Sequence, residues 1–86
     1  MKIELAYFGR SSEFLMMTSE SMVIPEQICT LGQVLNRLRE RGDRWAYELD
    51  DSNVICTVER KAAMPVEAIA DGDEIGIFSR ISLFEI

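Results

Sequence analysis

The feature that most constrains the fold of this 86-residue chain is one well-marked amphipathic helix, set among short strand-like segments. Its apolar residues recur at helical spacing and form one stripe: Leu31, Val34, Leu35 and Leu38. Thr30 and Gln33 precede the stripe in the order of a capping box, and Gly42 is a typical helix end. We therefore predict a helix over about Leu31 to Arg41 that buries one face.

The segments before this helix predict strands. Residues 2–8 alternate in the manner of a half-buried strand. The residues of its apolar face are Ile3, Leu5 and Tyr7. Residues 9–12 predict a turn or loop. Residues 14–17 and 20–24 predict either the two arms of a hairpin or one irregular strand.

The segments after the helix predict two more strands and two short elements. Residues 43–49 predict a second, short helix with Asp43 as its N-cap. Residues 54–58 are apolar and mostly β-branched, which predicts a strand buried on both faces. Residues 66–70 favour one helical turn, and residues 74–81 predict the last strand. One face of that strand holds Ile75, Ile77 and Ile81.

The order of these elements predicts the fold. Strand, strand, helix, strand, short elements and strand together indicate an α+β domain, in which one main helix packs on one face of a mixed sheet. This is the β-grasp, or ubiquitin-like, arrangement, and its first and last strands lie side by side in the middle of the sheet. No linker or repeat divides the chain, so residues 1–86 are predicted to form a single domain.

Composition excludes several classes of function. The net charge of −6 disfavours nucleic acid, since there is no basic surplus to displace phosphate counterions. No apolar run is long enough to span a membrane, and the N-terminus shows no secretory pattern, so we predict a cytoplasmic protein. The chain has no histidine, and Cys29 and Cys56 have no metal-site spacing and are predicted to be buried. We therefore predict no catalytic residue, no metal site and no cofactor.

One surface stands out as a predicted interaction site. Strand alternation places Phe8 and Phe78 on the side of the sheet away from the helix, together with Glu4 and Arg80. Exposed aromatic rings beside an arginine are typical of protein interfaces. The alternative is that residues 61–70 fold over the two rings and bury them.

Three motifs, in order, carry a resemblance to a known family. They are Asp43-Arg44-Trp45-Ala46, the acidic pair after Leu49, and Ala70-Asp71-Gly72-Asp73-Glu74-Ile75. With these motifs the chain resembles the small subunit of molybdopterin synthase, of the MoaD/ThiS-like sulfur carriers. The resemblance implies a β-grasp fold, no catalysis by this subunit itself, and an apolar patch at Phe8 and Phe78 that docks on a large catalytic subunit.

The tail departs from that family. Family members end in Gly-Gly, whose terminal carboxylate becomes an acyl-adenylate and then a thiocarboxylate, whereas Leu83-Phe84 stand at those positions here. We therefore expect a protein-binding module without sulfur-carrier chemistry, whose partner contacts are Phe8, Phe78, Arg80, Leu83 and Phe84. The alternatives are a genuine carrier whose tail lies beyond Ile86, or a structural protein that self-associates through its apolar C-terminal strand.

Alternation extended along the last strand also gives an expectation for the tail itself. It places Leu83 with the core-facing residues, and Phe84 and Ile86 on the side of Phe78. Because these side chains are strongly apolar, we expect the tail to pack against its own domain or against a second copy.

Overall fold

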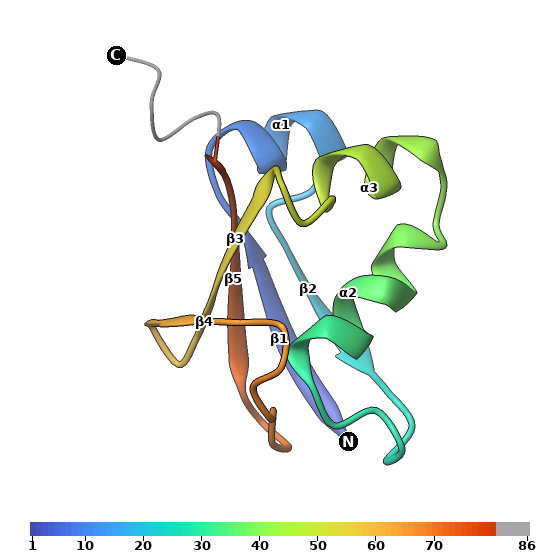
Figure 1. The fold of residues 1–86 in the computed structure, drawn as a ribbon, viewed down its shortest axis with the longest axis vertical. Coiled ribbons are helices and arrows are strands. Elements are labelled where there is room, and N and C mark those ends of the chain that lie inside the picture. Colours follow the sequence, from blue (N-terminus) through green and yellow to red (C-terminus); the bar gives the residue numbers. More distant parts are fainter. Residues whose placement is uncertain (81–86) are drawn as a thin grey trace.

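The structure is a computed structural model that describes residues 1–80, and in it a five-stranded sheet carries three helices (Figure 1). The strands are β1 (Lys2–Tyr7), β2 (Ser19–Val23), β3 (Val54–Val58), β4 (Lys61–Ala63) and β5 (Glu74–Ser79). The helices are α1 (Arg10–Leu15), α2 (Leu31–Arg39) and α3 (Asp43–Glu48). Within this part of the chain, no helix is long and apolar enough to cross a membrane.

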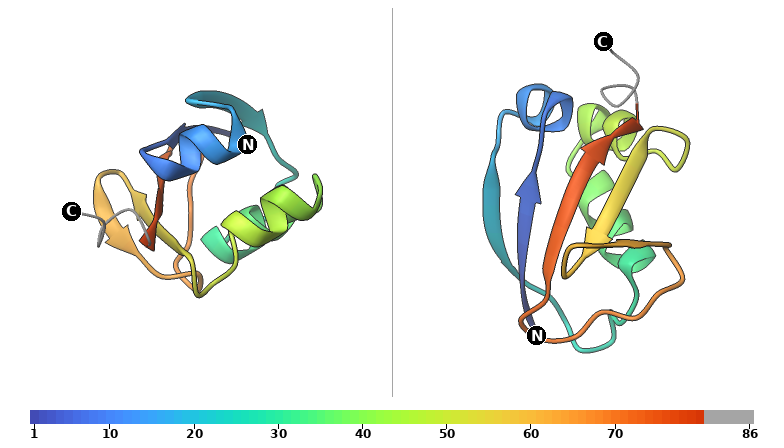
Figure 2. Two further views of the ribbon diagram at one scale, coloured as in Figure 1. Left: turned by 90° about the horizontal axis from the view of Figure 1, so that it is seen from above. Right: turned by 90° about the vertical axis from the view of Figure 1, so that its left-hand side faces the viewer.

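The sheet has the strand order β2-β1-β5-β3-β4 (Figure 2). β1 and β5 run parallel at its centre, with Tyr7 opposite Ile77, and the other neighbouring strands pair antiparallel. The prediction that the first and last strands lie side by side is therefore confirmed, and so is the α+β β-grasp class. This pairing matters for function because it brings Phe8 and Phe78 to adjacent places in the sheet.

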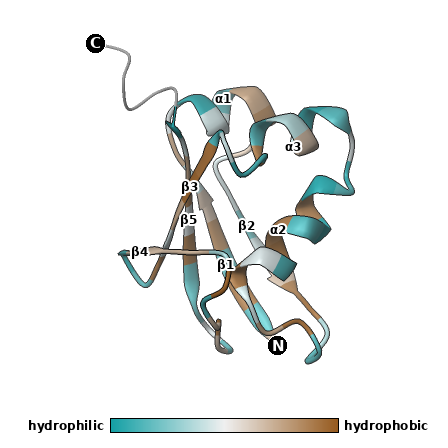
Figure 3. Ribbon diagram, in the orientation of Figure 1, coloured by the Kyte–Doolittle hydropathy of each residue, from teal (hydrophilic) through white to brown (hydrophobic). Residues whose placement is uncertain are grey.

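The core lies between α2 and one face of the sheet. All four residues of the predicted stripe of α2 are at most 1% exposed, and they belong to one cluster with the inward side chains of the central strands. The capping box is also formed, because the Gln33 amide donates to Thr30 Oγ1 at 3.3 Å and the Thr30 amide donates to Gln33 Oε1 at 3.1 Å. Figure 3 shows hydrophobic residues along β1 and β3.

The prediction for residues 9–17 is wrong, because residues 10–15 form α1 in place of a turn followed by a strand. Contacts distant in the sequence explain the difference. The Ser11 hydroxyl donates to Glu48 Oε2 at 2.8 Å from a fully buried position, and Leu15 joins the core. The helix ends at Met16, which adopts a left-handed conformation at φ 57°. The predicted strand over residues 20–24 is confirmed as β2.

The prediction of a helical turn over residues 66–70 is also wrong. Pro65 and Val66 form a turn, closed by the hydrogen bond from the Glu67 amide to the Met64 carbonyl at 3.0 Å. Residues 68–70 then run beside the start of α2: the Ile69 amide donates to the Cys29 carbonyl at 2.9 Å, and the Leu31 amide donates to the Glu67 carbonyl at 3.0 Å. The strand β4 was not predicted. It follows a two-residue turn at Glu59 and Arg60, which both have positive φ, as in a tight β-hairpin.

Smaller differences concern burial and helix ends. β3 is buried on one face, since Val54 and Cys56 are covered while Ile55 is half-buried, so the prediction of burial on both faces is wrong. α2 ends two residues earlier than predicted, at Arg39. α3 forms as predicted, but its N-cap is Gly42 instead of Asp43. The predicted position of Ile81 in the last strand lies outside the described residues.

Candidate docking face

The two phenylalanines identified from the sequence lie against each other on the open side of the sheet. The Phe8 amide donates to the Ile77 carbonyl at 3.0 Å, which continues the β1–β5 pairing by one step. The Phe8 and Phe78 rings are stacked, with centroids 4.7 Å apart and an interplanar angle of 10°. Offset stacking of this kind adds to the packing energy of an aromatic pair. The strand pairing thus assembles one flat aromatic surface from two ends of the chain.

Gly76 supplies the floor beneath the rings. A Cβ atom at this position would come 3.2 Å from Phe78 Cε2 and 3.4 Å from Phe8 Cε2, and it would clash with Thr57 Oγ1. The absence of a side chain therefore lets the two rings lie close to the backbone of β5. Sequence reasoning did not single out Gly76, although a glycine inside a strand commonly marks such a close approach.

The aromatic pair is open to solvent. Phe8 is 44% exposed, whereas Phe78 is partly buried beneath its neighbours. The alternative that residues 61–70 cover the rings is wrong, because that loop lies on the α2 side: the Gly32 amide donates to the Pro65 carbonyl at 2.8 Å. We call the surface formed by Phe8 and Phe78 over Gly76 the docking face.

The other predicted site residues are placed differently. Glu4 is exposed and accepts a hydrogen bond from the Ser21 hydroxyl of β2. Arg80 is exposed just after β5, where its amide donates to the Asn53 carbonyl at 2.6 Å, and it borders a cavity beside α2. It therefore lies at the end of β5, beside the start of β3, and its role in partner binding stays a prediction. Leu83 and Phe84 lie outside the described residues, so their role in partner binding stays a prediction.

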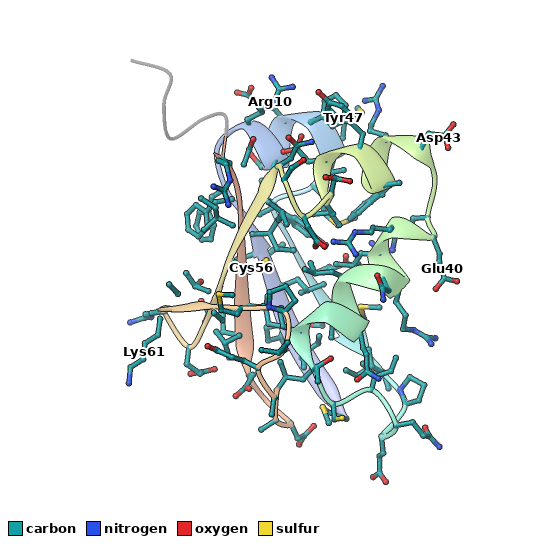
Figure 4. The ribbon with its side chains drawn as sticks, in the orientation of Figure 1. Arg10, Glu40, Asp43, Tyr47, Cys56 and Lys61 are labelled. Carbon is teal, nitrogen blue, oxygen red and sulfur yellow. The ribbon has the colours of Figure 1, made fainter. Side chains whose placement is uncertain are left out.

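A second aromatic cluster lies on α1 and α3 and was missed because α1 was not predicted. The Phe14 ring has the guanidinium groups of Arg10 and Arg44 at 5.7 and 5.1 Å from its centroid, and the Tyr47 ring at 5.9 Å. Figure 4 labels Arg10 on α1 and Tyr47 on α3. Arg10 also approaches the buried Glu48 carboxylate at 3.8 Å. These contacts join the two helices, so we interpret the cluster as structural.

A charged network ties β1 and β2 to the end of α2. The Tyr7 hydroxyl donates to Glu20 Oε1 at 2.8 Å, and Arg41 binds the same carboxylate through two contacts of 2.7 and 3.1 Å. Burial, followed by the Glu20 hydrogen bond, raises the pKa of Tyr7 above its ordinary value. Burial also tends to raise the pKa of Glu20, but hydrogen bonds from Arg41 and Tyr7 outweigh this effect and lower the pKa of that carboxyl.

The cysteines have different environments. Cys56 is buried on β3 as predicted, and burial raises the pKa of its thiol to about 12. Cys29 is exposed, so the prediction that it is buried is wrong. Within residues 1–80, no three histidine, cysteine or acidic side chains are placed to hold a metal ion together.

A small mixed sheet with its main helix on one face and an open aromatic pair on the other defines a ubiquitin-like protein of the β-grasp class. The sequence profile of the ThiS family matches residues 5–82 of the chain. The protein therefore belongs to the ThiS family, that is, to the MoaD/ThiS-like sulfur carriers and modifiers of ubiquitin fold. Small proteins of this family act as sulfur carriers or modifiers and are not catalysts themselves. They work together with partner proteins.

Solved structures agree with this fold. A Pyrococcus furiosus protein, provisionally named molybdopterin converting factor, subunit 1, matches with a TM-score of 0.75 and 19% identity, over 92% of this chain and 97% of that one. SAMP1 from Haloferax volcanii matches with a TM-score of 0.70 and 25% identity, over 95% and 98% of the two chains. The HVO 2177 protein of the same organism has a TM-score of 0.76 and 24% identity, over 92% and 82%. No curated protein sequence matches the chain.

Proposed function

We propose that this protein binds a partner protein through the docking face and does so without carrying sulfur on a terminal thiocarboxylate. The observation that carries the proposal is the stacked pair of rings, with Phe8 44% exposed on the open side of the sheet. Aromatic residues at the centre of an interface commonly supply most of its binding energy. A small domain that acted alone would gain stability by covering this surface.

The chemistry of the face indicates the kind of partner. An apolar pocket would accept the two rings, and a basic surround would suit the net charge of −6. The name of the similar Pyrococcus furiosus protein, molybdopterin converting factor, subunit 1, supports a partner in molybdenum cofactor synthesis. We therefore propose the large subunit of molybdopterin synthase, or a related protein of that pathway, as the partner, with Arg80 contributing at the edge of the contact.

The absence of sulfur transfer rests on the residues at positions 83 and 84. A glycine tail is thin and adaptable enough to enter a narrow enzyme pocket. Leu83 and Phe84 are bulky, and the resemblance of the chain to the small subunit of molybdopterin synthase implies that they take the places of the two glycines. The proposal therefore keeps the fold and the docking face and omits the carboxylate chemistry.

Titration calorimetry tests the docking. The full chain is titrated into a molybdopterin synthase large subunit encoded by the same genome, alongside a Phe8→Ser variant. Because truncation of a central aromatic anchor costs about 2 kcal/mol or more, we expect the Kd to rise by at least about tenfold.

Val23→Ser is the matched control for this experiment, since Val23 is 78% exposed on the edge strand β2 and lies away from the docking face. It should leave the Kd unchanged. Equal affinities of the Phe8→Ser variant and the original chain would reject the docking face. Failure of the original chain to bind would reject this partner.

A second candidate function is that of a genuine sulfur-carrying subunit whose glycine tail is encoded beyond Ile86. Membership in the ThiS family favours it. The DNA sequence following the codon of Ile86 decides between the two candidates. An in-frame Gly-Gly close to that point would support the carrier, and its absence would support the binding module.

A further inference from the structure

An apolar groove lies beside α2, at the outer edge of the sheet. Its cavity has a volume of about 340 Å³, which is within the range of about 300–1,000 Å³ typical of sites that hold small ligands. The wall is formed by α2, β3, β4 and the segment after β4, through Leu31, Leu35, Val54, Cys56, Ala63 and Met64. Met64 is 63% exposed at the rim. The groove is thus large enough for several apolar side chains and is open to water.

The chain leaves β5 at one end of this groove. Arg80 borders the cavity, and its amide is bonded to the Asn53 carbonyl, directly before β3. Asp51 borders the cavity as well, and its carboxylate pairs with Arg39 at 2.8 Å. The far end reaches Pro65, whose carbonyl accepts from the Gly32 amide at the start of α2.

The next six residues have the sequence Ile-Ser-Leu-Phe-Glu-Ile, in which four side chains are large and apolar. An extended segment of this length spans about 20 Å, because each residue adds about 3.3 Å. The five residues of β3 span about 17 Å on the same basis. Because β5 runs antiparallel to β3, a segment that continues from Arg80 must first reverse its direction. After a turn of about two residues, four extended residues remain and span about 13 Å, which covers most of the groove beside β3.

We propose that residues 81–86 of the chain itself occupy this groove, with Leu83 and Phe84 as the side chains that fill it. The occupant is attached at the mouth of the groove, so it needs no encounter with a second molecule. The apolar side chains of the segment match the apolar wall. The exposed rim residue Met64 would gain cover from it, and flexible methionine side chains adapt well to such contacts.

This inference goes beyond the proposed function and does not depend on it. Leu31 and Leu35 belong to α2, on the opposite side of the sheet from the rings of Phe8 and Phe78. A filled groove would leave the docking face open. It would also hold positions 83 and 84 against their own domain, whereas a carrier must extend its tail into another protein.

The reactivity of the Cys56 thiol tests the proposal, because Cys56 lines the groove and lies on β3 (Figure 4). A Cys29→Ser background removes the only other cysteine. The rate of alkylation by iodoacetamide is followed by intact mass, with and without Phe84→Ser. Loss of one buried Phe side chain should accelerate labelling by about tenfold or more. Glu85→Gln is the matched control in the same segment and should leave the rate unchanged.

Nuclear Overhauser contacts distinguish the possible occupants. In the unmodified chain we expect contacts from the Phe84 ring to the methyl groups of Leu35 or Ala63 within one molecule. Equal labelling rates with and without Phe84→Ser, together with the absence of these contacts, would overturn the proposal. Contacts seen only between differently labelled molecules would overturn it as well, because they would make a second copy the occupant.

Discussion

At the scale of single residues, the docking face depends on one glycine. Gly76 is buried in β5, and where its side chain would begin the Phe78 ring lies at 3.2 Å, closer than ordinary contact, and the Phe8 ring at 3.4 Å. The nearest atom to that point is Thr57 Oγ1, on the neighbouring strand β3. A larger residue would have to displace the threonine or the rings. The flatness of the face is therefore set by the strand as well as by the aromatic residues.

We predict that Gly76→Ala destabilises the protein by about 1–3 kcal/mol, as overpacking usually does. Urea unfolding measures the change. Thr57→Ala removes the nearest clashing atom, so the double variant should lose less stability than the sum of the two single variants. Strictly additive losses would show that the added methyl group does not meet Thr57.

Glu20 is a second residue with a measurable consequence. Hydrogen bonds from Arg41 and Tyr7 lower the pKa of its carboxyl in the folded state, against the opposing effect of burial. Because this pKa is lowered, ionised Glu20 stabilises the folded protein at pH values above its ordinary pKa of 4.5. The stabilisation is lost as the pH falls through the pKa that Glu20 has in the folded protein.

The free energy of unfolding should therefore fall more steeply below pH 4.5 in the original chain than in a Glu20→Gln variant. Other carboxyls titrate in both proteins, so the difference between the two pH profiles is the quantity to measure. Parallel profiles would mean that the hydrogen bonds of Glu20 to Arg41 and Tyr7 do not stabilise the folded protein.

At the scale of elements, the sequence predicted correctly those elements that depend on residues close together in the chain, and missed those that depend on distant contacts. The capping box and the apolar stripe of α2 lie within nine consecutive residues, from Thr30 to Leu38, and both form as predicted. α1 instead depends on the hydrogen bond from Ser11 to Glu48, 37 residues away. Residues 66–70 likewise form no helical turn, because Glu67 and Ile69 are hydrogen-bonded to residues at the start of α2 and just before it. Local patterns cannot reveal such partners.

The packing of α2 gives a test at this scale. Leu35 is 1% exposed in the centre of the core, so Leu35→Ala should cost about 2–5 kcal/mol through the cavity it leaves. Urea unfolding provides the value. Met16→Ala, at a position that is 82% exposed, should change stability by no more than about 0.5 kcal/mol. A cost for Leu35→Ala as small as that of the control would place Leu35 outside the core.

At the scale of the whole molecule, the chain has the fold of its family, and its first and last strands pair in the middle of the sheet. Strand alternation put Phe8 and Phe78 on the same side of the sheet, and the predicted β-grasp arrangement made their strands neighbours, as the pairing of β1 and β5 confirms. Gly76 and the groove beside α2 were not foreseen, since both depend on how separate strands approach one another. Arg80 was predicted on the open face; it borders the groove as well, and its part in partner binding stays a prediction.

We propose that the protein binds a partner through its docking face and lacks the terminal carboxylate chemistry of the sulfur carriers. The most direct test is the intact mass of the full chain after incubation with an activating enzyme of the family, ATP and a sulfur donor. A family member that ends in Gly-Gly serves as the positive control. We predict that the mass of this chain stays unchanged while that of the control rises. A stoichiometric gain equal to the replacement of one oxygen by one sulfur would contradict the account.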